Sequence, residues 1–333
     1  MTDRPRLILV LTENWTIVDP GDPGALVGLA QQAESAGVDA VMLSEHIVLG
    51  PSAAADGLMS NPREYALPGN QDPAMPWPSS VVLLSAIAAA TTRLRLVAGA
   101  ILAPLRHPLL LARELGTLDL LSRGRLVVLP TVSWHEEEYE ALGVDFHRRG
   151  RLLDEQLAVW DRVWRDSPIS FAGEHYRFAD VWLEPKAFRP EGPRLWFGGS
   201  SVHPALVRRL VRYGAGFNPL GRMSDDELAG LAGALREGGR DPAEVEMVGG
   251  IRGAFPDDES PADLAEAVGD SVPEQIARGF TSFCFKPNQF TDDIGDWRSV
   301  CEEAVARVGE AVERSGGVAA ARSAWSAAGL AGT

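Results

Sequence analysis

The chain has 333 residues, 45% hydrophobic and 23% charged, and its 46 acidic against 31 basic residues give a formal net charge of -15. This length is enough to bury one large core or two small ones, and a single barrel-sized domain with insertions is the simpler expectation. A surplus of negative charge opposes a phosphate backbone and offers no steering toward an anionic membrane surface, so we expect no nucleic-acid partner.

Targeting signals and cysteine content indicate the compartment. The N-terminus lacks the long apolar core of a signal peptide, and no stretch approaches the roughly 18 to 20 unbroken apolar residues of a membrane span. The two cysteines, Cys284 and Cys301, are too few for a disulfide framework and lie in apolar patterns typical of core residues. The sequence therefore predicts a cytoplasmic protein.

Short apolar runs alternate with helix-period segments along the chain, which is the pattern of repeated βα units. The expected strands are 7–11, 40–43, 94–102, 125–129, 194–197, 215–218, 245–248 and 280–285. The expected helices are 24–36, 79–90, the segment after Pro108, the segment from Arg151, then 203–212, 224–237, 262–268 and 293–315. Eight strands and at least eight helices predict an α/β fold, a (β/α)8 TIM barrel in a single domain over residues 1–315. A doubly wound sheet stays the alternative, although no G-x-G-x-x-G follows the first strand.

Three segments depart from this regular spacing. Residues 47–78 contain six prolines and little periodic hydrophobicity, so they form a long excursion after the second strand and are a lid candidate. Residues 171–193 read as a small hairpin with an extended return, which either decorates the surface or helps to cover the active site. The segment 316–333, rich in Ala, Gly and Ser, is expected to be a flexible C-terminal tail.

Ser44-Glu45-His46 stands where the second strand leaves the sheet, which is where α/β proteins build their chemistry. An imidazole there can give or take a proton near neutral pH, whereas the simpler interpretation of His46 is a rim histidine with satisfied hydrogen bonds. Glu45 either orients His46 or contacts solvent or an arginine, because consecutive strand residues face opposite sides.

Two glycine motifs stand at backbone positions with special requirements. Gly99-Ala100 lies inside a strand, where glycine indicates a bulge or a close backbone approach, or only tight packing. Gly198-Gly199-Ser200-Ser201 precedes a helix start near Val202, so N–H groups and two hydroxyls can hold a phosphate. Taken alone, this motif is more often a turn with an N-cap.

Other common site types find no support. The remaining histidines have no metal-ligand spacing, and the acidic run 136–138 at a helix start favours the helix dipole, so we expect no metal site. His107 is expected to cap the helix that follows it. The sequence contains neither a G-x-S-x-G elbow nor a Walker glycine loop.

Several short segments together carry a family resemblance from Leu7 to about Ala306, strongest over 38–164. In chain order they are Ala33-Glu34-x-x-Gly37-x-Asp39, Ser44-Glu45-His46, Arg106-His107-Pro108, Leu118-Asp119-x-x-Ser122-x-Gly124-Arg125, Glu138-Tyr139-x-x-Leu142-Gly143, Arg148-x-x-Arg151-x-x-Asp154-Glu155 and Pro193-x-Leu-Trp-Phe-Gly-Gly-Ser-Ser201. In order and spacing the chain resembles the bacterial-luciferase-like family of flavin and deazaflavin oxidoreductases.

This resemblance implies a TIM barrel that binds its cofactor at the C-terminal mouth and frequently dimerises. It implies that His46 handles a proton and that Gly99 and Ala100 contact the central ring, through a bulge that in some relatives includes a non-prolyl cis peptide. The phosphate is expected at Gly198, Gly199, Ser200 and Ser201. Thr131 and Ser133 are further cofactor contacts, although 129–134 lacks the glycine-rich turn of many relatives.

The subgroup resemblance favours hydride transfer between the deazaflavin F420 and a small organic substrate. The alternative within the family is a monooxygenase that uses reduced FMN and oxygen, with a separate reductase supplying the reduced cofactor; a non-catalytic flavin-binding barrel is the third option. Arg106, Arg208 or Arg209 are candidates to guide the anionic tail of F420. Three aromatic residues, Trp15, Trp77 and Trp134, suggest an apolar organic substrate, and we expect a homodimer.

Overall fold

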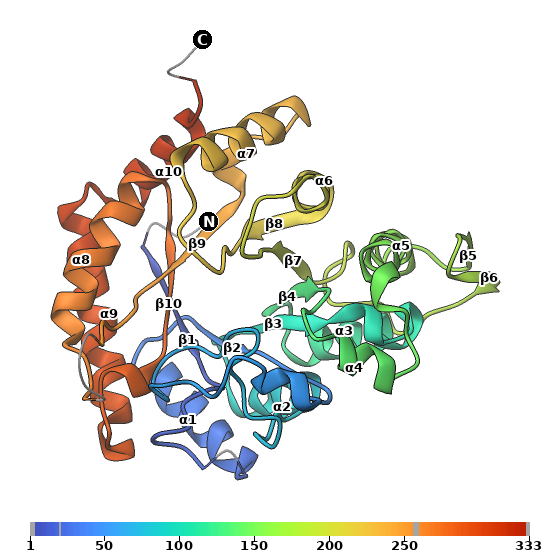
Figure 1. Cartoon of the computed structure of the whole chain (residues 1–333). Coiled ribbons are helices and arrows are strands. Elements are labelled where there is room, and N and C mark those ends of the chain that lie inside the picture. Colours follow the sequence, from blue (N-terminus) through green and yellow to red (C-terminus); the bar gives the residue numbers. More distant parts are fainter. Residues whose placement is uncertain (1–3, 20, 256–259, 331–333) are drawn as a thin grey trace. The chain divides into compact units, whose positions relative to one another are not determined.

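The computed structural model describes residues 4–19, 21–255 and 260–330. Eight strands form a closed barrel in the order β1-β10-β9-β8-β7-β4-β3-β2 (Figure 1). Their bounds are β1 (Arg6–Val10), β2 (Ala40–Leu43), β3 (Arg95–Leu102), β4 (Leu126–Thr131), β7 (Arg194–Phe197), β8 (Gly214–Phe217), β9 (Glu246–Gly250) and β10 (Ser282–Phe285). The predicted (β/α)8 TIM barrel is confirmed, and the eight predicted strands match these within about two residues.

Helices follow the strands as the 3.6-residue spacing predicts. They are α1 (Pro23–Ser35), α2 (Ser80–Ala90), α3 (Pro108–Leu121), α4 (Glu136–Ala141), α5 (Arg149–Val163), α6 (Pro204–Tyr213), α7 (Asp225–Glu237), α8 (Leu264–Ala277), α9 (Trp297–Arg314) and α10 (Gly317–Ala327). Short 3-10 turns lie at η1 (Pro51–Ala54), η2 (Ala103–Leu105), η3 (Phe146–Arg148), η4 (Pro242–Glu244), η5 (Pro287–Gln289) and η6 (Ile294–Asp296).

Local sequence explains where several helices begin. The Ser224 side chain accepts from the Glu227 N–H while the Glu227 carboxylate accepts from the Ser224 N–H, a capping box that starts α7. His107 caps α3 by accepting from the Leu109 N–H at 3.3 Å, as predicted. Pro108 follows as the first helical residue, where its missing N–H costs nothing.

The chain divides into two compact units, each described by itself. Unit 1 comprises Met1–Asp19, Gly28–Met42 and Leu195–Thr333, and unit 2 comprises Pro20–Val27 and Leu43–Arg194. In unit 1, Trp297 on α9 is fully buried and its indole N–H donates to the Leu29 carbonyl on α1 at 3.2 Å. In unit 2, the indoles of Trp160 on α5 and of Trp164, which directly follows α5, donate to the Pro108 and Ala112 carbonyls on α3. These hydrogen bonds hold the two helices together.

The two internal insertions differ in how much regular structure they contain. Residues 47–78 contain little regular structure beyond η1. The second insertion holds an antiparallel hairpin of β5 (Ile169–Ala172) and β6 (Arg177–Val181). The Glu155 carboxylate on α5 accepts from three successive N–H groups of the hairpin turn, those of Glu174, His175 and Tyr176. The hairpin is thereby fixed to α5, next to which it lies in Figure 1.

The C-terminal segment corrects the sequence-based expectation. Residues 317–327 form α10 instead of a flexible tail, because Val318, Ala321 and Trp325 make a buried stripe at helical spacing. Arg236 on α7 donates to the Ser326 and Ala328 carbonyls at 2.6 and 2.7 Å. These two carbonyl groups at the end of α10 thereby have hydrogen-bond donors. Composition rich in Ala, Gly and Ser concealed this stripe.

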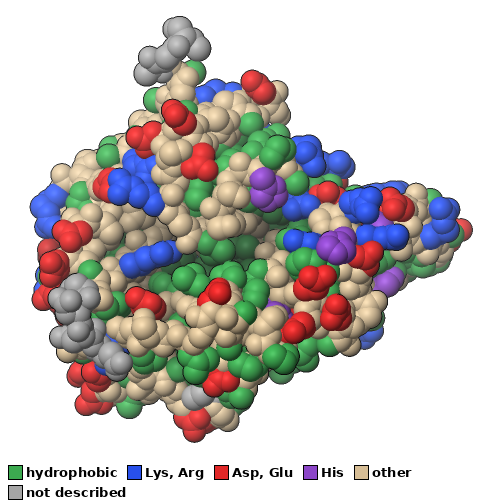
Figure 2. Space-filling model, in the orientation of Figure 1, with side chains coloured by type: hydrophobic (Ala, Val, Ile, Leu, Met, Phe, Trp, Pro, Cys, Tyr) green, Lys and Arg blue, Asp and Glu red, His purple; other side chains and the backbone are tan. Residues whose placement is uncertain are grey.

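The molecular surface carries charged side chains of both signs. On the face drawn in Figure 2, lysine and arginine side chains are interspersed with acidic ones. Within the described ranges, no helix has both the length and the apolar character needed to cross a membrane. The same ranges contain no cluster of three or more histidine, cysteine, aspartate or glutamate side chains that can hold a metal ion.

Candidate active site

His46 lies just beyond β2 in unit 2, and its side chain is 9% exposed. Its Nδ1 atom is 3.4 Å from Oε2 of Glu138. Two indoles flank the imidazole edge to face: the ring of Trp77 has its centroid 5.3 Å away, and that of Trp134 lies at 5.8 Å. The His135 ring is 6.4 Å away. The structure thus places a titratable ring in an aromatic enclosure, together with two of the three predicted tryptophans.

Glu138 on α4 is fully buried and collects four contacts on its two carboxylate oxygens. Oε1 accepts from the N–H groups of Ile47 and Val48 at 2.6 and 3.3 Å. Oε2 faces His46 and also accepts from the Ser133 hydroxyl at 3.2 Å. Assigning the acidic run to the helix dipole overlooked this residue. The signal that pointed to it was the motif Glu138-Tyr139-x-x-Leu142-Gly143.

His135 provides a second connection between the β4–α4 loop and the excursion 47–78. Its buried Nε2 accepts from the Gly50 N–H at 2.7 Å. Burial lowers the pKa of His135, with Glu137 and Glu138 opposing the shift, which agrees with a neutral ring that accepts at Nε2. A Cβ on Gly50 would fall 1.9 Å from a Glu137 carboxylate oxygen, so this close approach needs glycine.

Glu45 is buried and is held by groups other than His46. Its carboxylate forms a two-pronged ion pair with Arg106, at 2.8 Å from Nη1 to Oε1 and 3.1 Å from Nη2 to Oε2. The Ser80 hydroxyl and the Leu102 N–H also donate to it, at 2.6 and 2.9 Å. Of the two interpretations of Glu45, contact with an arginine is therefore the one observed, and the carboxylate that approaches His46 is Glu138.

The backbone irregularity expected at Gly99-Ala100 is present. The pairing of β3 with β4 shifts register between Gly99 and Ile101, and the Gly99-Ala100 peptide bond is cis. Gly99 is buried and Ala100 is partly exposed. Thr131, partly exposed, ends β4 opposite Leu102. A bulge in β3 thus lies in the same unit as His46.

Ser133 has a left-handed backbone, with φ of 58°, in the loop after β4. Besides donating to Glu138, its hydroxyl accepts from the His135 N–H at 3.3 Å. The Tyr139 hydroxyl donates to the Val132 carbonyl and fixes the same loop to α4. The loop after β4 is therefore held by side-chain hydrogen bonds.

The predicted phosphate motif lies in unit 1, between β7 and α6. Helix α6 begins at Pro204, one residue after the start of the expected helix 203–212, and the ring of His203 accepts from the Leu206 N–H at 3.3 Å. Burial and the nearby Arg209 and Arg208 lower the pKa of His203, consistent with a neutral acceptor. The first turn is thus partly capped by the chain itself, and a phosphate would rest on the loop 198–202.

The geometry of this loop fits a small anion. A Cβ on Gly198 would lie 1.8 Å from the Asn218 carbonyl oxygen, so Gly198 packs against the loop after β8. At Gly199 the nearest atom to such a Cβ is 3.7 Å away, an ordinary van der Waals distance, so the backbone there is not tightly covered. Ser200 and Ser201 are exposed. The motif therefore combines an accessible backbone with two accessible hydroxyls.

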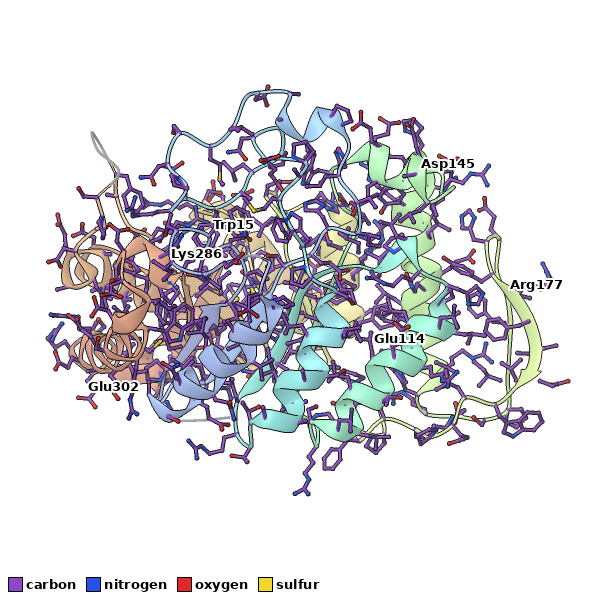
Figure 3. All side chains as sticks on the ribbon, turned by 90° about the horizontal axis from the view of Figure 1, so that it is seen from below. Trp15, Glu114, Asp145, Arg177, Lys286 and Glu302 are labelled. Atoms are coloured by element: carbon purple, nitrogen blue, oxygen red, sulfur yellow. The ribbon has the colours of Figure 1, made fainter. Side chains whose placement is uncertain are left out.

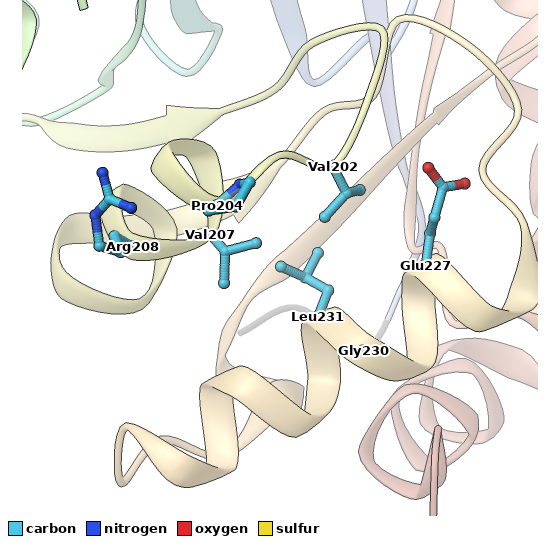
Figure 4. A pocket seen from close by; sticks show the side chains of 7 residues that line it. All are labelled: Val202, Pro204, Val207, Arg208, Glu227, Gly230 and Leu231. Atoms are coloured by element: carbon cyan, nitrogen blue, oxygen red, sulfur yellow. The ribbon is translucent and has the colours of Figure 1, made fainter.

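A shallow groove of about 470 Å³ adjoins the same loop, between α6 and α7 (Figure 4). It is lined by Val202, Pro204, Val207, Arg208, Glu227, Gly230 and Leu231. Of the three arginines proposed for an anionic tail, Arg106 is engaged by Glu45 and Arg209 is buried. Arg208 is exposed and lines the groove.

Trp15 also belongs to unit 1 and is partly exposed in the segment after β1. The adjacent Asn14 accepts from the Asn288 N–H at 3.1 Å, so this segment lies beside the one after β10, where Lys286 is fully buried (Figure 3). Cys284 and Cys301 are buried free thiols, and burial raises the pKa of each to about 12. The prediction that both cysteines are core residues is confirmed.

The closed parallel barrel defines a TIM-barrel protein with chemistry-bearing residues in the loops that follow its strands. The family model for luciferase-like monooxygenases matches residues 5–268, so the chain belongs to the luciferase-like monooxygenase family. This confirms the family predicted from the sequence motifs.

Individual relatives differ in how much they share with this chain. The FMNH(2)-dependent dimethylsulfone monooxygenase of Pseudomonas putida is 33% identical over 125 residues, 37% of this chain and 34% of that protein. The F420-dependent glucose-6-phosphate dehydrogenase of Kineococcus radiotolerans is 28% identical over 253 residues, 73% of this chain and 67% of that protein. The chain thus spans about a third of the first relative. The structure of monooxygenase RslO1 from Streptomyces bottropensis is 19% identical, covers 93% of this chain and 99% of its own, and has a TM-score of 0.64, which supports the fold.

Proposed function

We propose that this protein is an oxidoreductase that transfers a hydride between the deazaflavin F420 and a small organic substrate. The observation that carries the choice is the extent of similarity: the F420-dependent relative aligns over 73% of the chain and the FMNH(2)-dependent one over 37%. His46, in its aromatic enclosure, supports catalysis as opposed to binding alone.

Candidate cofactor contacts are proposed within each unit separately. In unit 2, the bulge at Gly99 and Ala100 would support the ring, and Thr131 follows at the end of the neighbouring strand. Ser133 would act mainly through the loop, because its hydroxyl is engaged by Glu138. In unit 1, Gly198, Gly199, Ser200 and Ser201 would hold the phosphate. Arg208 is the arginine best placed for an anionic tail, since it is exposed beside this loop.

The chemistry divides between cofactor and protein. Bound F420 supplies a hydride carrier that takes or gives two electrons at once. His46 would give or take the accompanying proton, because the working range of an imidazole includes neutral pH. Glu45, paired with Arg106, would hold the strand end from which His46 projects. Trp77 and Trp134 would present apolar surface to the substrate, and Trp15 is proposed for the same role.

Cofactor titration tests this proposal directly. We expect the purified protein to bind F420 with a micromolar or lower dissociation constant, about -8 kcal/mol or better, and FMN more weakly. Fluorescence titrations with both cofactors, oxidised and reduced, measure this difference. Preferential binding of FMN together with oxygen-dependent product formation would overturn the deazaflavin assignment.

A monooxygenase that uses reduced FMN is the second candidate, favoured by the 33% identity to the dimethylsulfone monooxygenase. That function would require a separate reductase as a partner. Binding of neither cofactor in the same titration would favour the third candidate, a non-catalytic barrel.

We also propose a homodimer formed through α2 and α3. Val82 on α2 and Leu110 on α3 are 70% and 60% exposed, and Ala86 and Ala89 continue the exposed face of α2. Exposed apolar side chains on neighbouring helices are typical of an interface. Val82→Glu is expected to convert a dimer into monomers, as measured by light scattering after gel filtration, with Leu142→Glu as the control. A monomeric wild-type protein would contradict the proposal.

The site of action is proposed to be the cytoplasm. Both cysteines are free and buried, which suits a reducing compartment. Fractionation of the native cells, with the protein detected by antibody, tests this; recovery outside the cytoplasmic fraction would refute it.

A further inference from the structure

We propose that Glu138 is the positioning residue of this site: its carboxylate holds the proton of His46 on Nδ1 and leaves Nε2 as the nitrogen that exchanges a proton. This inference rests on the proposed function only for the consequence in catalysis. The tautomer itself follows from contacts within the protein and can be measured without cofactor or substrate.

The contacts of the carboxylate define it as an acceptor. Main-chain N–H groups donate only, so Oε1 of Glu138 accepts from both Ile47 and Val48. Oε2 faces the Ser133 hydroxyl at 3.2 Å and Nδ1 of His46 at 3.4 Å. An ionised carboxylate has acceptor sites for all four groups, whereas a lone pair on Nδ1 would face Oε2 without a hydrogen between them.

The 3.4 Å separation is at the long end of hydrogen bonding. Nε2 of His46 makes no hydrogen bond to any residue in the described ranges. The flanking rings of Trp77 and Trp134 limit rotation of the imidazole. One nitrogen is therefore engaged by the protein and the other is left for chemistry, the arrangement in which a base is oriented by a third group.

The same carboxylate fixes the main chain that carries His46. Ile47 and Val48 follow His46 directly, so the chain from 46 to 48 wraps around Glu138. Its neighbours in the acidic run have other roles: Glu137 accepts from the Ser52 N–H, and Glu136 is exposed. Glu138 thus couples the tautomer of His46 to the beginning of the excursion 47–78.

Substitution of Glu138 with glutamine separates its effect on the His46 tautomer from its hydrogen bonds to the main chain at Ile47 and Val48. In Glu138→Gln, the amide oxygen can keep the two main-chain N–H bonds while the amide nitrogen replaces Oε2. That NH₂ group donates, so it favours a lone pair on Nδ1 and moves the imidazole proton to Nε2. Glu140→Gln, on the exposed side of the same helix, is the matched control.

The experiment is long-range ¹H–¹⁵N NMR of the full chain labelled with ¹⁵N-histidine, without cofactor, at a pH where the histidines are neutral. The His46 signals are assigned from their absence in His46→Ala. We expect the Nδ1–H tautomer in the wild type and in Glu140→Gln, and the Nε2–H tautomer in Glu138→Gln. An Nε2–H tautomer in the wild type overturns the proposal, even if the glutamine variant does not fold. An unchanged Nδ1–H tautomer in a folded Glu138→Gln protein, checked by circular dichroism, does the same.

Turnover then distinguishes this inference from the proposed function. If both hold, Glu138→Gln lowers kcat by about 10²-fold or more with little change in cofactor affinity. Proton exchange at Nε2, in either direction, interconverts the imidazolium and the Nδ1–H tautomer, and glutamine disfavours that tautomer. A changed tautomer with wild-type turnover would uphold Glu138 as the group that positions the ring and overturn the catalytic role of His46.

Discussion

Replacing His46 with alanine is expected to lower turnover by about 10² to 10⁴-fold while the affinity for F420 changes little. The expectation follows from the position of the ring, just past β2 and 9% exposed between two indoles. Removing a group that moves a proton raises the barrier of the chemical step, whereas the phosphate and the cofactor ring retain their own contacts. Steady-state kinetics with the true substrate, together with a cofactor titration, measure both quantities.

His147→Ala is the matched control for this experiment. Its side chain is 81% exposed beside Glu136, so its removal should leave turnover unchanged. Wild-type turnover in His46→Ala would eliminate the proposed role of His46. A loss of turnover accompanied by an equal loss of cofactor affinity would instead indicate that the ring contributes to binding.

The barrel could be predicted from the sequence because its cause is local. Buried strands require continuous apolar runs and surface helices require a 3.6-residue stripe, and both patterns are legible without a structure. Helix α10 was not predicted, because a stripe of only Val318, Ala321 and Trp325 gives a weak periodic signal in a segment dominated by small residues. Its burial depends on packing against other helices, which periodicity does not report.

In the candidate site, too, local features could be predicted from the sequence and tertiary contacts could not. His46 could be predicted because it directly follows a recognisable strand. Glu138 could not, since what separates it from Glu136 and Glu137 is complete burial against a segment ninety residues earlier in the chain. Pairing of Glu45 with Arg106 is equally a tertiary contact, across 61 positions. Residue type and local pattern therefore identified the loop that carries the site. The role of each residue in that loop follows from tertiary contacts that the sequence does not show.

Placing a carboxylate in the phosphate loop should have the second large effect, and it acts on binding. Gly199→Asp is expected to weaken cofactor affinity by several kcal/mol, about a hundredfold or more, because like charges roughly 4 Å apart near a protein surface repel by up to about 4 kcal/mol. The new side chain can be accommodated, since the nearest atom to a Cβ at Gly199 is 3.7 Å away. The folded protein should therefore persist, which circular dichroism and the thermal midpoint check.

Gly199→Ala is the control that separates charge from bulk. It adds a Cβ that makes only ordinary van der Waals contacts, so it should retain affinity within a few-fold, and the difference in affinity between the two variants measures the charge repulsion. Raising the salt concentration should narrow that difference, because exposed charges are screened. Equal affinity of Gly199→Asp and wild type for F420, in proteins of unchanged fold, would place the cofactor phosphate elsewhere and leave the Gly-Gly-Ser-Ser segment as an ordinary turn before α6.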